Sequence, residues 1–162
     1  MRAVLQRVSH ATVRCAGGHT AAIGRGLVVL LGVGREDGGT DVEALARKIP
    51  RLRLFPDAAG VMNLSLLEMN GSAAGDHVDS AGQPGEILLV SQFTLHADTR
   101  RGLRPFYGEA APPELAAPLC EDLLNRFRSQ GLTVAAGVFG DHMEIDLCAD
   151  GPVTIMLDTR AS

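Results

Sequence analysis

The stretch Gly26-Leu27-Val28-Val29-Leu30-Leu31-Gly32-Val33 decides the fold, because no polar side chain interrupts it. A strand with one face in solvent alternates apolar and polar residues, whereas a strand covered on both faces is apolar throughout. We therefore expect Leu27–Val33 to lie in the centre of a sheet, with packed layers on both sides. The run is far too short to span a membrane.

Strand-like segments surround this central run. Gly17-Gly18 is a typical hairpin signal between two of them, whereas Val61–Met69 is ambiguous. Residues 70–84 are rich in Gly, Ser, Ala and Asp, which predicts a flexible, exposed loop. The further strands that we expect are Arg2–Val8, Ala11–Cys15, His19–Ile23, Arg51–Phe55, Glu86–Leu95, Val134–Gly137, Met143–Cys148 and Val153–Asp158.

Two segments have helical patterns. Thr40-x-x-Glu43 is a capping box that opens the first helix. The second helix, Pro113–Gln130, has an irregular first turn at Pro118 and ends before Gly131. Its apolar stripe is Leu115, Leu119, Leu123, Leu124 and Phe127. We therefore predict one α+β domain over residues 1–162, with mostly antiparallel sheets in a partly closed, barrel-like core and the two main helices packed outside.

The composition narrows the possible partners. The net charge is −4, which argues against indiscriminate binding to polyanions such as DNA but permits a local basic face. The three cysteines, Cys15, Cys120 and Cys148, form no C-x-x-C pair, so neither a zinc site nor a disulfide framework is indicated. No apolar segment typical of a secretory signal follows the N-terminal arginines. We expect a cytoplasmic protein with no metal, cofactor or membrane partner.

Polar residues at the end of the strand Glu86–Leu95 are candidates for chemistry. In a regular strand Gln92 and Thr94 share one face. Polar groups at a strand end occur equally in active sites and as solvent-exposed residues without a functional role. His96 with Asp98 could act as a base for Thr94, although a histidine at such a position is more often on the surface. No G-x-S-x-G motif is present.

Two further patterns carry competing interpretations. Gly32-x-Gly34 looks like the start of a dinucleotide-binding motif, but Asp37 stands where the third glycine belongs. The long loop His96–Pro112 combines arginines with aromatics, which suits phosphates and exposed bases, or forms a solvated loop pinned by its aromatics. The residues concerned are Arg100, Arg101, Arg104, Phe106 and Tyr107, and a second basic group is Arg47, Lys48, Arg51 and Arg53.

Asp150-Gly151-Pro152 stands between two expected strands. Asp-Gly and Gly-Pro are ordinary turn dipeptides, so a hairpin turn is the simplest interpretation. Alternatively, glycine permits close approach and proline lacks an N–H, so the pair could present two carbonyl oxygens to a partner. About 5–6% of X–Pro bonds are cis, and the local sequence leaves the choice open.

Taken together, Ser91-Gln92-Phe93-Thr94-Leu95 and Gly151-Pro152-Val153-Thr154 resemble the two signature motifs of D-aminoacyl-tRNA deacylases. The resemblance covers nearly the whole chain. It also includes the segments Met1–Ser9, Gly26–Val33, Met62–Ser65 and Ala97–Arg100.

The resemblance implies a homodimeric, cytoplasmic editing enzyme without metal or cofactor. Such an enzyme hydrolyses the ester that joins a D-amino acid, or glycine, to the terminal adenosine of tRNA. Gly151 and Pro152 would form a cis dipeptide that enters the other subunit's pocket as a chiral gate, supported by Arg7. The catalytic residues would lie at the end of the strand, and they would be Ser91, Gln92, Phe93 and Thr94. Backbone N–H groups there would donate hydrogen bonds to the developing oxyanion.

Elementary chemistry makes this mechanism reasonable. An L side chain would collide with the two gate carbonyls, whereas a D side chain points away and glycine has nothing to clash. Thr94 has been considered a nucleophile in the family, but the sequence offers it no convincing base, so we favour water assisted by the substrate's 2′-hydroxyl. Arg100, Arg101 and Arg104 are our hypothesis for tRNA contacts.

This chain departs from the family pattern at three places. Ala149 replaces an asparagine that usually precedes the Gly-Pro pair, His96 replaces a common tyrosine, and residues 70–84 form an insertion. Two other functions remain open from the sequence. One is a tRNA-binding module without turnover, and the other is a metabolic hydrolase that uses Thr94 and His96.

Overall fold

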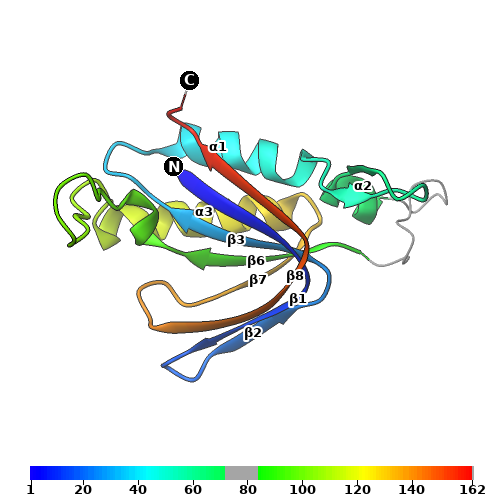
Figure 1. Cartoon of the computed structure of the whole chain (residues 1–162), viewed down its shortest axis with the longest axis horizontal. Coiled ribbons are helices and arrows are strands. Elements are labelled where there is room, and N and C mark those ends of the chain that lie inside the picture. The colour runs from blue at the N-terminus through cyan, green and yellow to red at the C-terminus, as the bar shows by residue number, and fades with distance from the viewer. Residues whose placement is uncertain (72–83, 162) are drawn as a thin grey trace.

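The computed structural model describes residues 1–71 and 84–161 and is built around one strongly curved sheet (Figure 1). The strand order is β2-β1-β3-β6-β7, and β8 pairs with the other edge of β1. Most of the predicted loop at 70–84 lies outside the described residues, and residues 70 and 71 belong to a helix. The strands of the sheet are β1 (Arg2–Cys15), β2 (Thr20–Ile23), β3 (Gly26–Gly32), β6 (Glu86–Ser91), β7 (Thr133–Ala136) and β8 (Met143–Asp158).

The central position of β3 is confirmed. It pairs with β1 on one side, antiparallel, and with β6 on the other, parallel. Leu27, Val29 and Leu31 face the core under the helices, while Val28 faces a second apolar core. The β6–β7 pair is also parallel, because α3 returns the chain across the sheet between these strands. The α+β, barrel-like fold is confirmed, with a parallel part that the sequence did not indicate.

Two long strands replace four predicted short ones. Arg2–Val8 and Ala11–Cys15 are parts of β1, which bends where its register against β8 shifts on both sides of Val8. Such bulges bend a strand without ending it. The first half of β1 pairs with β3 and the second half with β2. This bend curls the sheet into its barrel-like shape.

The hairpin turn considered at Asp150–Pro152 does not exist. Residues 143–148 and 153–158 belong to the single strand β8, which follows the bend of β1. The Gly151-Pro152 peptide bond is cis, and it lies inside this strand. Local turn chemistry was therefore overridden by pairing with a strand more than a hundred residues away in sequence.

The two main helices, α1 (Gly39–Lys48) and α3 (Pro113–Ser129), cover one face of the sheet (Figure 1). α3 ends as predicted, with Gly131 at φ 82° and the Leu132 N–H directed to the Phe127 carbonyl. The predicted capping box of α1 is wrong by two residues, because Asp41 accepts the Gly38 N–H at 3.0 Å. None of the helices in the described residues is long and apolar enough to cross a membrane.

The segment after α1 is less regular than predicted. Instead of a strand at Arg51–Phe55, a 3-10 helix η1 (Ile49–Arg51) precedes a short β-ladder. The ambiguous Val61–Met69 contains a true capping box, since Ser65 and Glu68 exchange hydrogen bonds between side chain and backbone. The elements here are β4 (Phe55–Pro56), β5 (Met62–Leu64) and α2 (Leu66–Gly71).

Candidate active site

The first motif forms a tight turn at the end of β6 rather than the continued strand that we expected. β6 ends at Ser91, and Phe93–His96 form a 3-10 helix, η2. The Gln92 N–H donates to the Leu31 carbonyl at 2.7 Å, which ties the turn to β3. A Cβ on Gly32 would lie 3.0 Å from the Gln92 carbonyl oxygen, so the turn needs a glycine beneath it. Gln92 and Thr94 therefore do not share a strand face.

A cavity of about 500 Å³ opens beside this turn. Ser91, Gln92 and Phe93 line it, whereas Thr94 does not. Its other walls come from β3, from the first turns of α3 and from the loop between β7 and β8. The lining residues outside the motif include Leu31, Val33, Pro113, Ala116, Cys120, Phe139, Gly140, Asp141 and His142.

The β7–β8 loop and the start of α3 are site components that the sequence reasoning missed. The loop carries an exposed Phe139 followed by Gly140, whose φ is 80°. Asp141 accepts hydrogen bonds from the Gly17 and His142 N–H groups, each at 2.9 Å, and so fixes the loop. An exposed aromatic beside glycines between two strands is the signal that could have identified this loop.

His96 does not form the base that we considered for Thr94. It is buried, with 8% of its surface exposed, and its Nε2 has no hydrogen-bond partner among the described residues. Its ring packs where a Cβ on Gly32 or Gly34 would lie about 3 Å from it. The two glycines of Gly32-x-Gly34 therefore make room for a histidine, which is a structural reason for this pattern. The expectation of a surface histidine is wrong.

The thiol in the cavity wall is chemically quiet. Burial raises the pKa of Cys120 to about 11, so the side chain is a neutral thiol at physiological pH.

At the start of a 3-10 helix the first backbone N–H groups have no acceptor within the helix. In this turn those groups belong to Phe93 and Thr94. The turn can therefore donate backbone hydrogen bonds to an oxygen.

The second motif is exposed on the outer strand of the sheet. Gly151 and Pro152 are both exposed, and Gly151 has φ 120°, which favours glycine. The dipeptide is held from below by Arg7, which is only 8% exposed. Arg7 Nε lies 3.0 Å from the Asp150 carboxylate and 3.3 Å from its carbonyl oxygen, and Nη1 donates to the Leu54 carbonyl at 2.5 Å.

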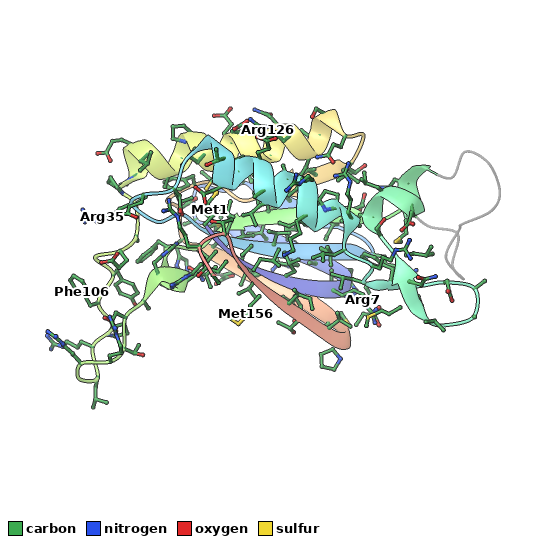
Figure 2. The ribbon with its side chains drawn as sticks, turned by 90° about the horizontal axis from the view of Figure 1, so that it is seen from above. Met1, Arg7, Arg35, Phe106, Arg126 and Met156 are labelled. Carbon is green, nitrogen blue, oxygen red and sulfur yellow. The ribbon has the colours of Figure 1, made fainter. Side chains whose placement is uncertain are left out.

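One chain does not bring the two motifs together. Ser91 pairs with Leu31, and Leu31 pairs with Ala3 near the start of β1. Gly151 lies beside the bulged part of β1 around Val8. At about 3.3 Å per residue, these positions are about 16 Å apart along β1 alone. In Figure 2, Arg7 lies at the opposite end of the molecule from Phe106, whose loop follows the first motif.

The three predicted tRNA-binding arginines are not equivalent. Arg100 is paired with Asp98 through Nε–Oδ1 and Nη2–Oδ2 contacts of 2.9 and 2.7 Å. The Arg100 hydrogen bonds lower the pKa of Asp98 to about 2. Arg101 and Arg104 are exposed and have no ion pair with any described residue. No group of three or more potential metal ligands occurs in the described part of the chain.

Comparisons with known proteins cover nearly the whole chain. Residues 4–158 match the family model described as D-Tyr-tRNA(Tyr) deacylase. The chain is 50% identical over 160 residues to the D-aminoacyl-tRNA deacylase of Anaeromyxobacter dehalogenans strain 2CP-C, covering 99% of this chain and 98% of that one. It is 47% identical over 160 residues to the D-aminoacyl-tRNA deacylase of Thermosipho africanus strain TCF52B, with the same coverage.

Two solved structures are similar to the fold. One is described as a c-Myc DNA unwinding element binding protein, with a TM-score of 0.82 and 37% identity over 99% of this chain and 100% of that chain. The other is described as a probable eukaryotic D-amino acid tRNA deacylase, with a TM-score of 0.72 over 96% of this chain and 97% of that chain. At 18% identity, the second likeness concerns the fold alone.

Proposed function

The chain belongs to the D-Tyr-tRNA(Tyr) deacylase family, and we propose that it is an editing hydrolase that cleaves the ester bond of D-aminoacyl-tRNA in the cytoplasm. The observation that carries this proposal is the cavity at the end of β6. Its volume of about 500 Å³ is within the roughly 300–1,000 Å³ of small-ligand sites. Its walls are mainly apolar, with polar groups from the Ser91–Gln92 turn, which suits an aminoacyl group on a terminal adenosine.

The Ser91–Thr94 turn supplies the chemistry by positioning rather than by attack. The N–H group of Phe93, at the cavity wall, stabilises the oxyanion that forms at the ester carbonyl. The substrate's 2′-hydroxyl assists the attacking water. Three observations support this assignment over a protein nucleophile: Thr94 does not line the cavity, His96 packs against glycines, and the Cys120 thiol is neutral.

Gly151 and Pro152 act in the cavity of a second copy of the chain. Two observations support this assignment. Both residues are exposed, and the part of β1 beside them is about 16 Å along the strand from the part of β1 that is in register with Ser91. β8, the strand that carries them, pairs only with β1 among the described strands, so its other edge is open. Long open edges are places where chains associate. Met156 on β8 is 79% exposed, which adds an exposed apolar side chain to a face of this strand.

The dipeptide acts as the chiral gate by steric exclusion. An L side chain would meet the gate carbonyls, whereas a D side chain would point into the apolar part of the cavity. Glycyl-tRNA passes the same gate, because a steric filter cannot reject a smaller substrate. Arg7 holds the dipeptide through the Asp150 carbonyl.

Three matched substrates test the function: D-Tyr-tRNA, L-Tyr-tRNA and Gly-tRNA, each assayed for release of the amino acid. We expect rapid cleavage of the first, slower cleavage of the third, and no enzyme-dependent cleavage of the second. Equal hydrolysis of the D and L esters would contradict the gate. Binding of all three without cleavage would instead favour the non-catalytic tRNA-binding module.

A second measurement tests the role of the 2′-hydroxyl. Replacing the terminal adenosine with 2′-deoxyadenosine leaves binding nearly intact and lowers kcat by about 100-fold, within the range for a positioned proton-transfer group. Thr94→Ala changes kcat only a few-fold. A large loss in T94A with an unchanged response to the deoxy substrate would assign the nucleophile to Thr94.

A further inference from the structure

The aromatic side chains of this protein are distributed unevenly. The chain has five Phe, one Tyr and no Trp, and Phe55 and Phe127 are fully buried in the core. The other four aromatics are all at least 37% exposed. They lie on the rim of the active-site cavity or on the loop beside it, and they are Phe93, Phe106, Tyr107 and Phe139.

These four residues lie in the cavity wall, in contact with it, or in a neighbouring groove. Phe93 and Phe139 line the cavity itself. Tyr107 contacts Phe93 edge-to-face, with ring centroids 5.1 Å apart. Phe106 lines a neighbouring groove of about 620 Å³, which we call the His96 groove and which is also lined by Arg2, Arg35, His96, Asp98 and Arg100. In Figure 2, Phe106 lies on the loop at the end of the molecule away from Arg7.

The Phe106 ring is held in position although it is 64% exposed. Its backbone exchanges two hydrogen bonds with Asp98, at 2.7 and 2.9 Å. The ring lies over Gly108 so closely that a Cβ on that residue would be 2.1 Å from the Phe106 Cζ. A planar face that is fixed before a ligand arrives loses little entropy on binding.

The charged side chains around the Phe106 ring suggest where bases and where phosphates would bind. The four groove arginines are already engaged. Arg2 pairs with Asp158, Arg35 with the Gly108 carbonyl, Arg100 with Asp98 and Arg160 with Glu36. The groove therefore has mixed polarity, which suits the polar edges of a base. Arg101 and Arg104, on the loop between Asp98 and Phe106, have no such partner among the described residues.

We propose that Tyr107 and Phe106 form a second stacking site, which binds the unpaired nucleotides that precede the terminal adenosine of the tRNA, with their phosphates facing Arg101 and Arg104. Exposed bases stack on aromatic side chains with little dependence on sequence. This site rests on the proposed function, because the cavity must hold the terminal adenosine for the strand to leave over Phe93 and Tyr107.

Two substrates separate this site from the catalytic cavity. D-Tyr-tRNA reaches both, whereas the 3′-O-D-tyrosyl ester of adenosine has no preceding nucleotide and reaches the cavity alone. For Phe106→Leu we expect the KM for D-Tyr-tRNA to rise about tenfold with little change in kcat, as loss of one stacked base predicts. The kcat/KM for the adenosine ester changes less than twofold, and Phe106→Tyr restores the KM for D-Tyr-tRNA.

Two further variants control for indirect effects. Gly108→Ala displaces the Phe106 ring and reproduces the KM effect of F106L. Leu103→Ala, at a fully exposed apolar residue on the same loop, leaves both substrates unchanged. If F106L alters both substrates equally, or neither, the stacking site is wrong. If the unmodified enzyme cleaves neither D-ester, the proposed function fails, and the stacking site falls with it.

Discussion

The two signature motifs differ in how much of their surroundings the chain itself supplies. Ser91–Phe93 face a cavity whose walls come from β3, α3 and the β7–β8 loop. Gly151 and Pro152 are exposed on a strand whose second edge is open among the described strands, and Arg7 supports them from beneath. The first motif lies in the wall of a pocket, whereas the second projects from the surface and can enter a pocket. This difference supports the proposal that two copies complete one site.

Mixing two defective chains is the strongest test of this comparison. Ser91→Phe fills the cavity, and Gly151→Ala with Pro152→Ala removes the dipeptide that closes the cavity over the substrate and holds it in position. Each protein alone should therefore lose about 100-fold in kcat/KM for D-Tyr-tRNA. In a 1:1 mixture exchanged by co-refolding, half of the dimers contain one intact site of two. Recovery of about a quarter of the unmodified activity is therefore expected.

Assays of each variant refolded alone are the controls for this experiment. A mixture with no more activity than its components would show that the gate acts in its own chain. Because one chain separates the motifs by about 16 Å along β1, such a result would require a large rearrangement of β8.

Gly151→Ala alone tests how strictly the gate is shaped. The residue has φ 120°, and a Cβ would lie 2.9 Å from Val153 Cγ2 and 3.2 Å from Arg7 Nη2. Strain of about 1–3 kcal/mol is typical of such positions, and the backbone will shift to relieve it. We expect the ratio of kcat/KM for D-Tyr-tRNA over L-Tyr-tRNA to fall about tenfold. Gly18→Ala, at φ 89° in open space, carries similar backbone strain and should leave that ratio unchanged.

Sequence patterns predicted the elements whose determinants are local. The apolar run of β3 and the terminal glycine of α3 are properties of single segments, and both were confirmed. In the predicted α3 stripe, Leu123 and Phe127 are buried and Leu119 and Leu124 pack against the core, but Ala116 is buried in place of Leu115. The merging of two predicted strands into β8 depends on β1, whose bulges bend it around Val8. A glycine and a proline inside β8 look like a turn, because turn chemistry is read locally while strand pairing is not.

The candidate site likewise combines residues that a local sequence pattern reveals with residues that only long-range contacts bring together. The Ser91–Thr94 motif was visible because it is one stretch, although its strand ends earlier than predicted. Phe139 and Cys120 reach the cavity only because α3 crosses the sheet and β7 pairs in parallel with β6. The burial of His96 depends on two glycines that end another strand. These contacts join distant segments, and no local pattern encodes them.

Arg7 and Arg14 provide a smaller, stability-based test, since each joins β1 to an aspartate on β8. The Arg7 side chain is 10% exposed and also caps the Leu54 carbonyl, whereas the Arg14 side chain is 53% exposed. Arg7→Ala leaves buried polar groups without partners and should lower the free energy of unfolding by about 2–3 kcal/mol. Arg14→Ala should lower it much less, because solvent screens an exposed ion pair. Equal losses in urea denaturation would mean that Arg7 does not support the gate strand specifically.

The smallest expected effect concerns Arg100, whose charge Asp98 already balances. The pKa of Asp98 is about 2, lowered by its hydrogen bonds with Arg100. The stabilisation from this pair is thus complete above the ordinary pKa of 3.8 and is lost only as the pH falls through about 2. The pair therefore persists at every pH used for tRNA binding.

Arg101→Ala and Arg104→Ala should each reduce the salt slope of tRNA affinity by about 0.7, whereas Arg100→Ala should change it little. Asp98→Asn releases Arg100 and should strengthen binding a few-fold; weaker binding in D98N would show that the pair, and not the free guanidinium, meets the RNA.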